Sequence, residues 1–328
     1  MRPRQGEAIV LTTAFAACLA LLATSAAPDQ TPTPSPQEPQ AKERLQVQVD
    51  ATEITLKHGE RMVLQYRYTD VPFKPYVRAM YSPAGVNVVQ DAPPDHLHHH
   101  GLMFAVGVDD VHFWAEDRRA GTQMHTNTTV DVRDDAAAFS GLLPWHIDSK
   151  VLVREYRRIT VAHTPPGLAT NLITWWTSLT PDSEATLTGS HYYGLGMRFA
   201  ASIDRTGTFI NAAGADGEVF RGDERLVQAN WCAYTAEVGG KPVTVAMFDH
   251  PQNVRPATWF TMKSPFAYLS ATLRYHKQPL KLERGKTLDL YYGVAVWDGR
   301  VDSARIEQVY RHWLQNTQRP STSRSDEQ

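Results

Sequence analysis

Apolar and polar residues alternate along most of this sequence, which is the pattern of half-buried β-strands. Leu45, Val47 and Val49 begin the alternation, and Ile54 and Leu56 continue it before a turn at 58–60. The same period recurs at residues 62–68, 129–133, 150–161, 171–179, 185–190, 242–248, 259–263, 268–275 and 288–297. Because Gly- and Pro-containing turns and no helices separate these segments, the sequence excludes a doubly wound α/β fold and predicts a large antiparallel β-sandwich, all-β in class.

Helical periodicity is clear in one segment near the end of the chain. Apolar residues recur every three or four positions from Ile306 to Leu314, and Asp302 precedes them as a candidate N-cap. We predict a C-terminal helix that closes one edge or end of the sheets.

The first residues have the features of a secretory signal peptide. Arg2 and Arg4 precede an apolar run at 8–23, and Ser25-Ala26-Ala27 offers a cleavage site. The run of about 16 residues is shorter than the roughly 20 of a membrane-spanning helix, so cleavage after residue 27 is favoured over a retained anchor. We therefore expect a secreted or periplasmic protein with no membrane span in the mature chain.

Two further segments have compositions that do not support a packed core. Residues 28–44 carry five prolines among Thr, Ser, Gln and Glu and are predicted to be a disordered linker, and residues 317–328 a disordered tail. A single β-sandwich domain is predicted over residues 45–316. Once the leader is removed, Cys232 is the remaining cysteine, so the domain cannot contain a disulfide.

Charge and motif content give no support for nucleic-acid or nucleotide partners. The net charge of −2 comes from 33 basic and 35 acidic residues that are well mixed. The sequence Gly194-Leu195-Gly196 lacks the third glycine and the following helix of a phosphate-binding loop. A Gly-x-Ser-x-Gly nucleophile motif is also absent.

The most unusual feature is a histidine-rich motif, Asp95-His96-Leu97-His98-His99-His100-Gly101, which holds four of the chain's thirteen histidines. If this motif is extended, alternation places His96, His98 and His100 on one face and Asp95 and His99 on the other. The first set then forms candidate ligands for one divalent metal ion. Histidines bonded to nearby backbone at a strand end are the alternative. We predict a polar functional site here.

Several motifs resemble the DUF6807 family, which carries the label "methane oxygenase PmoA". They are Tyr81-Ser82-Pro83-Ala84-Gly85, the histidine motif, His112-Phe113-Trp114, Gly194-Leu195-Gly196-Met197-Arg198 and His250-Pro251-Gln252-Asn253. The family motif reads Asp-His-Pro-His-His-Arg-Gly, so this chain has Leu97 for proline and His100 for arginine. A protonated His100 would still supply a cation at that position.

The resemblance implies a carbohydrate ligand. A particulate methane monooxygenase subunit needs several membrane-spanning helices, and this chain has one candidate at most, so the label does not carry over as function. The family resembles secreted bacterial proteins that accompany sugar oxidoreductases and glycan-degrading enzymes. Their expected fold is similar to that of aldose mutarotases, which implies a carbohydrate only by analogy of fold.

We therefore expect a secreted carbohydrate-active enzyme whose histidine-rich pocket performs acid–base chemistry, namely hydrolysis, elimination or isomerisation, on a glycan or keto-sugar. The alternatives are a non-catalytic glycan-binding β-sandwich and a copper- or iron-dependent oxidoreductase. The candidate catalytic residues are His96, His98, His99, His125, Arg198 and His250. The candidate substrate-binding residues are Asp95, Trp114, Tyr192, Trp231, Asn253 and Trp259, although tryptophans in a sandwich more often belong to the core.

Overall fold

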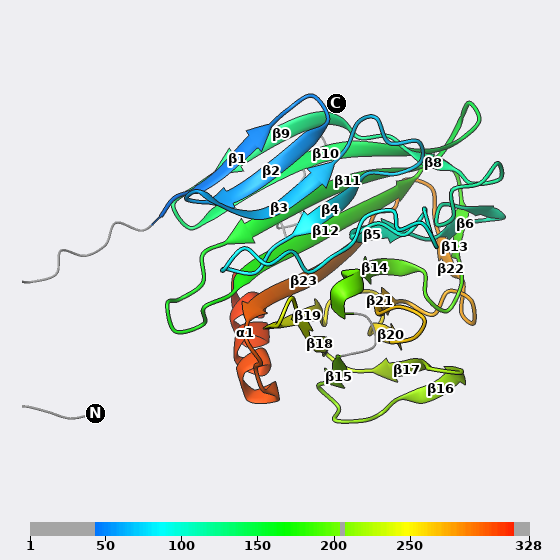
Figure 1. Ribbon diagram of the computed structural model, residues 1–328. Helices are drawn as coiled ribbons and strands as arrows, with labels where there is room; N and C mark the ends of the chain where they lie inside the picture. Colours follow the sequence, from blue (N-terminus) through cyan, green and yellow to red (C-terminus); the bar gives the residue numbers. More distant parts are fainter. Residues whose placement is uncertain (1–42, 204–206, 318–328) are drawn as a thin grey trace, which may run out of the picture. The chain divides into compact units, whose positions relative to one another are not determined.

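The computed structural model describes residues 43–203 and 207–317, which form two large antiparallel sheets and a smaller one (Figure 1). The predicted signal peptide, nearly all of the predicted linker and the tail beyond Thr317 lie outside the described residues. None of the helices in the described part has the length and apolarity needed to cross a bilayer. The prediction of an all-β antiparallel sandwich with a C-terminal helix is confirmed.

The first large sheet has ten strands and carries the candidate site. In spatial order they are β1 (Leu45–Val49), β2 (Glu53–His58), β3 (Arg61–Arg67), β4 (Tyr76–Met80), β5 (Leu102–Ala105), β14 (Gly194–Arg198), β21 (Tyr268–Thr272), β20 (Thr258–Met262), β17 (Glu224–Gln228) and β16 (Glu218–Arg221).

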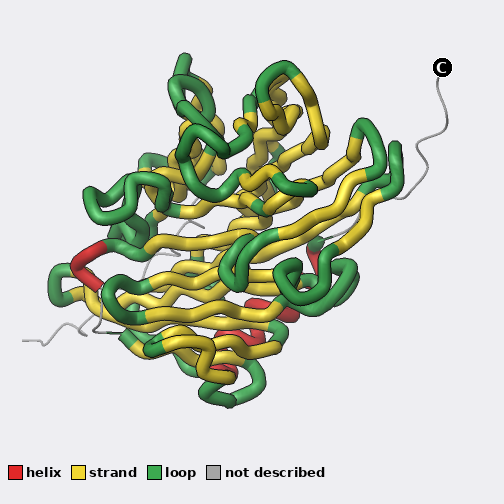
Figure 2. Tube along the Cα trace, turned by 90° about the vertical axis from the view of Figure 1, so that its right-hand side faces the viewer, coloured by secondary structure: helices red, strands yellow, loops and turns green. Residues whose placement is uncertain are grey.

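The second large sheet has nine strands. They are β15 (Thr208–Asn211), β18 (Trp231–Val238), β19 (Lys241–Asp249), β23 (Leu288–Asp298), β12 (Asn171–Pro181), β11 (Lys150–Ala162), β10 (Ala136–Ile147) and β8 (Thr122–Gln123), with β9 (Thr126–Val132) also paired to β10. The small sheet consists of β22 (Leu280–Leu282), β13 (Ala185–Thr188), β6 (Gly107–Val108) and β7 (Val111–His112). The short 3-10 helix η1 spans Ala201–Ile203. Figure 2 shows the strands lying side by side, with loops gathered at their ends.

Apolar side chains from both large sheets form one continuous core. Leu64, Phe104 and Leu269 of the ten-stranded sheet belong to the same buried cluster as Phe139 and Ile159 of the nine-stranded sheet. The period-two alternation of the sequence is the cause, because it turns every second side chain of each strand toward the opposite sheet.

The outer face of the nine-stranded sheet is covered in part by α1 (Ser303–Asn316), which begins after Asp302 as predicted. The carboxylate of Asp302 accepts a 2.8 Å hydrogen bond from Arg305 N. Gly293 lies under this helix, where a Cβ atom would come within 2.9 Å of Trp313. Since β18, β19 and β23 are buried on both faces here, Trp231 packs toward α1 while Cys232 packs into the main core.

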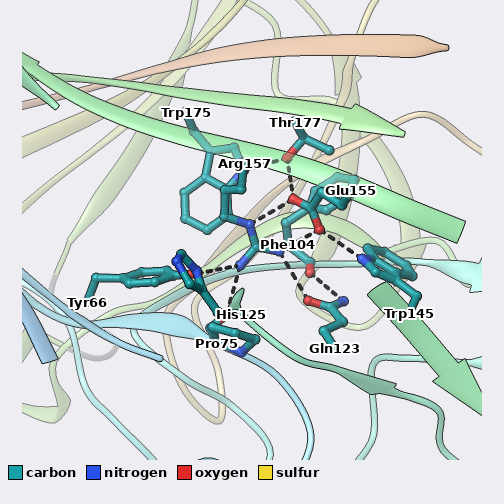
Figure 3. Close-up of polar contacts among 10 residues, drawn as sticks. All are labelled: Tyr66, Pro75, Phe104, Gln123, His125, Trp145, Glu155, Arg157, Trp175 and Thr177. Carbon is teal, nitrogen blue, oxygen red and sulfur yellow. Dashed lines mark hydrogen bonds and ion pairs between the residues drawn. The ribbon is translucent and has the colours of Figure 1, made fainter. Parts of the chain in front are cut away.

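A fully buried ion pair lies between the two large sheets (Figure 3). Arg157 Nε and Nη2 donate to the carboxylate of Glu155 at 2.7 and 2.8 Å. Trp145 Nε1 and Thr177 Oγ1 donate to the same carboxylate, and Arg157 also reaches the carbonyl of Pro75. Both charges are thus paired and hydrogen-bonded, which is the condition for burying them.

Candidate active site

The histidine motif folds as two successive turns. His96 N donates to Pro93 O and His99 N donates to His96 O, each at 2.9 Å, and β5 begins only at Leu102. The extended conformation considered for this motif is therefore wrong, and so is the sharing of one face by His96, His98 and His100, because side chains alternate only along an extended chain.

His96, His98 and His99 line a cavity of about 400 Å³ on the outer face of the ten-stranded sheet. Pairing of β17, β20, β21 and β14 places Phe260 beside Ser270 and Met262 beside Tyr268 on that face. The remaining wall is mostly aromatic and includes two charged side chains. These residues are Trp114, Tyr192, Arg221, Glu224, Phe260, Met262, Pro265, Phe266 and Tyr268.

Gly196 of β14 has no side chain and so leaves room for two aromatic residues of this wall. A Cβ atom at this position would overlap the hydroxyl oxygen of Tyr268 and lie 2.8 Å from Trp114. The side chains of Tyr268 and Trp114 can therefore settle against the sheet only because residue 196 is a glycine. Trp114 is fixed further by parallel stacking on Tyr193, with 5.1 Å between the ring centroids.

His99 is the most enclosed imidazole of the cavity. Its ring stacks on His96 at 4.6 Å and lies 5.2 Å from the ring of Tyr268. Burial, together with the charges of His98 and His96, lowers the pKa of His99 to about 2. Burial also lowers the pKa of His98, which is less enclosed. Both rings are therefore neutral at physiological pH.

Three neutral buried polar atoms on this wall have no hydrogen-bond partner among the described residues, namely Nε1 of Trp114, the hydroxyl of Tyr268 and Nδ1 of His99. A fourth atom, Oε2 of Glu224, also accepts no hydrogen bond, although His191 Nε2 lies 3.3 Å from it. Buried polar atoms in proteins are nearly always hydrogen-bonded. Here one donor, one hydroxyl that can donate or accept, and one imidazole nitrogen belong to residues that line the same cavity.

Glu224 is the one carboxylate on the cavity wall in the described part of the chain. Arg221 Nη2 donates to its Oε1 at 2.6 Å, and His191 Nε2 lies 3.3 Å from its Oε2. Neither Glu224 nor His191 was expected from the sequence. Glu224 follows the turn of the β16–β17 hairpin, more than 100 residues from the histidine motif, and no local pattern distinguishes it from a surface glutamate.

Asp95 and Arg198 brace the motif from outside the cavity lining. Asp95 Oδ2 lies 3.0 Å from His96 Nδ1 and accepts a 3.3 Å bond from Arg198 Nη2. The guanidinium of Arg198 lies 3.6 Å from the ring centroid of Phe266, a cation–π contact. Arg198 thus holds both the motif and an aromatic wall residue in place.

His100 points away from the cavity. Its Nδ1 lies 2.7 Å from Asp91 and its Nε2 lies 2.8 Å from Glu116, while the ring stacks on Tyr76. Both ring nitrogens of His100 thus lie within hydrogen-bond distance of a carboxylate.

Glu116 links His100 to the cavity wall. Lys74 Nζ, fully buried, donates to Glu116 at 2.8 Å and to the carbonyl of Trp114 at 2.9 Å. Burial acts to raise the pKa of Glu116, but the hydrogen bond from His100 and the charge of Lys74 outweigh it and lower the pKa to about 2. The hydrogen-bonded side chains of His100, Glu116 and Lys74 therefore hold the backbone of Trp114 in place on the side away from the cavity.

The metal ligand set considered for the motif is not assembled in this geometry. His96 and His98 face the cavity with 5.7 Å between ring centroids, but His100 is engaged by Asp91 and Glu116. Within residues 43–203 and 207–317, no three His, Cys, Asp or Glu side chains are arranged to hold a metal ion.

His125 lies in the interior network of Figure 3 and not at the cavity. Because Arg157 can only donate to the Tyr66 hydroxyl, that hydroxyl donates to His125 Nδ1, and His125 Nε2–H remains to donate to Thr128. Burial, with the charge of Arg157, lowers the pKa of His125 to about 3. Its contacts make it a structural group.

Four other candidates also lie away from the cavity. His250 lies beside Trp313 of α1, and Asn253 bonds Asp249 and the backbone of Tyr291. Trp231 donates to Glu307 beneath α1, and Trp259 is a core residue that donates to the carbonyl of Ala229. His96, His98, His99, Trp114 and Tyr192 are the sequence candidates that line the cavity.

The fold and the site define a β-sandwich protein with a histidine-lined cavity on one sheet. Over residues 53–311 the sequence matches the family of unknown function DUF6807, and the chain belongs to this family. The family part of the sequence-based identification is thereby confirmed. No curated protein matches the chain.

Solved structures of similar fold include sugar-active proteins. The GH36 α-galactosidase AgaB from Geobacillus stearothermophilus matches with a TM-score of 0.50 and 9% identity, covering 81% of this chain and 42% of that chain. A protein from Klebsiella pneumoniae, provisionally assigned as an aldose 1-epimerase, matches with a TM-score of 0.48 and 11% identity over 80% of this chain and 83% of that chain. This chain spans about two fifths of the length of the α-galactosidase. At such identities the likeness concerns the fold alone.

Proposed function

We propose that the protein binds a short saccharide in the cavity lined by His96, His98 and His99, and that His98 transfers a proton to or from the bound sugar. The observation that carries this proposal is the set of three unpartnered polar atoms on an aromatic wall. A sugar ring matches that wall, because its C–H face packs against aromatic rings and its hydroxyls both donate and accept hydrogen bonds.

The volume of the cavity supports a small ligand. Small-molecule sites have volumes of about 300–1,000 Å³, and this one, at about 400 Å³, lies near the lower end. One or two sugar units suit it better than a long chain. The fold similarity to an α-galactosidase supports a carbohydrate by analogy only.

The titratable groups favour proton transfer over ordinary glycoside hydrolysis. The usual glycosidase mechanism needs two carboxyl groups on either side of the scissile bond. The described cavity wall offers Glu224 alone, and Arg221 and His191 already contact it. His98, neutral and only partly enclosed, suits a general base, with Glu224 as the second polar group. Isomerisation of, or elimination from, a keto-sugar fits this pair best.

His99 has a different role in this proposal. A pKa of about 2 makes its imidazole too weak a base for proton abstraction near neutral pH. Its unpartnered Nδ1 instead suits a hydrogen bond to a sugar hydroxyl. The same weak basicity favours a second candidate function, a glycan-binding protein without turnover.

The test measures binding and turnover separately, with a panel of aldoses, ketoses, keto-sugars and disaccharides. Calorimetry detects binding and NMR detects product. We expect His98→Ala to lower turnover at least about 100-fold while changing the dissociation constant only a few-fold. His58→Ala, at the end of β2, is the matched control and should behave as the wild type.

Each outcome of that experiment has a definite meaning. Saturable binding without product from any sugar supports the glycan-binding candidate. No binding of any sugar, or full turnover by the His98→Ala variant, refutes the proposed enzyme.

The proposal also includes export of the protein from the cytoplasm. The leader-like residues 1–27 support cleavage and release into the periplasm or medium, with Pro28 as the first mature residue. Mass spectrometry of the protein recovered from the exported fraction tests this. A chain that begins at Met1 in that fraction would contradict it.

A further inference from the structure

A second and larger cavity lies on the outer face of the nine-stranded sheet, beside the C-terminal end of α1. Its volume is about 840 Å³, roughly twice that of the histidine-lined cavity, and it opens as a surface groove. None of its lining residues belongs to the histidine-lined cavity, which lies on the other large sheet.

The floor of the groove is a fixed cluster of aromatic side chains. Strand register places Arg158 of β11, Trp176 of β12 and Tyr291 of β23 in one row across the sheet. Trp176 stacks on Tyr291 with ring centroids 5.5 Å apart and planes 9° apart, and Tyr156 meets it edge-on at 5.0 Å. Trp176 is only partly buried and is held in place by a 3.0 Å bond from Nε1 to Asp289.

Polar side chains form the walls. The last turns of α1 contribute His312 and Gln315, and β11 contributes Thr160. The guanidinium of Arg158 is paired with Asp131 at 2.5 Å, so its charge is compensated within the protein. The other two charged lining residues, Arg133 and Asp135, have opposite signs, and Arg133 lies 3.8 Å from Asp131. The groove therefore offers apolar ring surface and hydrogen-bonding groups with balanced charges, which favours a neutral polyhydroxylated ligand over an anionic one.

We propose that this groove binds a neutral polysaccharide chain and holds the protein on the polymer. The choice of a carbohydrate rests on the proposed function, whereas the groove itself is an independent site. Aromatic side chains that are already fixed lose little conformational entropy when a sugar packs on them. Two sites on one domain would raise the local concentration of chain ends or side groups near the histidine-lined cavity.

Affinity electrophoresis tests the proposal with galactomannan, xyloglucan and mixed-linkage β-glucan as neutral probes and polygalacturonate as an acidic probe. We expect the wild type to be retarded by at least one neutral polymer. Trp176→Ala should raise the dissociation constant about five- to tenfold, and His312→Ala on the surface of α1 should raise it about twofold or more.

Two controls keep the result interpretable. Leu142→Ala removes an exposed apolar side chain from the neighbouring strand β10, outside the groove, and should migrate as the wild type. His98→Ala should also keep full retention, because the two cavities are separate. Thermal unfolding of Trp176→Ala shows whether it is folded, and His312→Ala carries the test if it is not.

The proposal is overturned if no neutral polymer retards the wild type, if both groove variants bind as the wild type does, or if polygalacturonate alone is bound. Loss of retention in His98→Ala overturns it as well, because the polymer would then occupy the histidine-lined cavity. Retention on a polymer combined with no binding of short saccharides leaves this groove supported and refutes the proposed function instead.

Discussion

Replacing Tyr268 by phenylalanine should change sugar binding and thermal stability in opposite directions. The hydroxyl of Tyr268 is buried, and it has no hydrogen-bond partner among the described residues. An unpaired buried polar group costs about 1–3 kcal/mol, so the variant should be at least as stable as the wild type. Each kcal/mol regained should raise the thermal midpoint by about 2–4 °C for a chain of this size.

Binding should change in the opposite direction. The proposed function predicts a hydrogen bond from the Tyr268 hydroxyl to the sugar, and a typical hydrogen bond contributes about 0.5–1.5 kcal/mol. The dissociation constant of Tyr268→Phe should therefore rise about 2- to 13-fold. Because burial raises the pKa of Tyr268 well above 10, the hydroxyl stays protonated and the effect should be the same from pH 6 to pH 9.

Tyr292→Phe is the matched control. The Tyr292 hydroxyl is also fully buried and without a hydrogen-bond partner in the described chain, but it lies in the core on β23 and away from the cavity. We expect the same effect on thermal unfolding and no change in sugar affinity measured by calorimetry. If Tyr268→Phe lowered the midpoint by several degrees and left affinity unchanged, the hydroxyl would have a structural role and the reasoning would be refuted.

Three further predictions concern buried ionisable side chains outside the cavity lining. Glu155→Ala leaves the fully buried Arg157 without its partner and should cost about 3–5 kcal/mol in urea unfolding, whereas Glu237→Ala, in an exposed ion pair, should cost less than about 1 kcal/mol; equal costs would contradict this. The pKa of Glu116 is lowered to about 2, so its contribution to stability is present above about pH 4.5 and is lost as the pH falls toward 2. Glu116→Gln should therefore make the free energy of unfolding less dependent on pH between about pH 4.5 and 2, and should not change that dependence at higher pH. The lowered pKa of His125, about 3, means that stability falls as the pH drops below about 6.5, where the unfolded chain takes up the proton, and His125→Asn should weaken that dependence between pH 6.5 and 3.

Sequence patterning predicted β11 and β12, whose buried and part-exposed residues alternate, and it also predicted β19, β20, β21 and β23, which are buried along most of their length. It missed β10, because the sequence from Ala136 to Ile147 mixes Ala, Ser, Gly and Pro and has no regular alternation. It also missed β18, whose outer face is covered by α1, so that the strand from Trp231 to Val238 is buried on both faces over most of its length. A second layer weakens the alternation of the strand that it covers, although β19 and β23, which also lie under α1, were predicted.

The candidate site was predictable in part. The density of histidines pointed to residues 96–100, yet the turn at Pro93 decided which imidazoles face the cavity. Tryptophans divided between wall and core because Trp114 and Trp259 differ in tertiary position and not in local sequence. Glu224 reaches the cavity through strand pairing that joins distant segments, and a single sequence contains no signal for it.

The most direct test of the central claim is a crystal structure of the protein with a short saccharide from the binding panel. We predict a sugar ring against Trp114 and Tyr268, with hydroxyls within hydrogen-bond distance of Trp114 Nε1, Tyr268 Oη and His99, and a ring carbon or hydroxyl within reach of His98. A saccharide bound elsewhere, with these three polar atoms still without partners, would contradict the account.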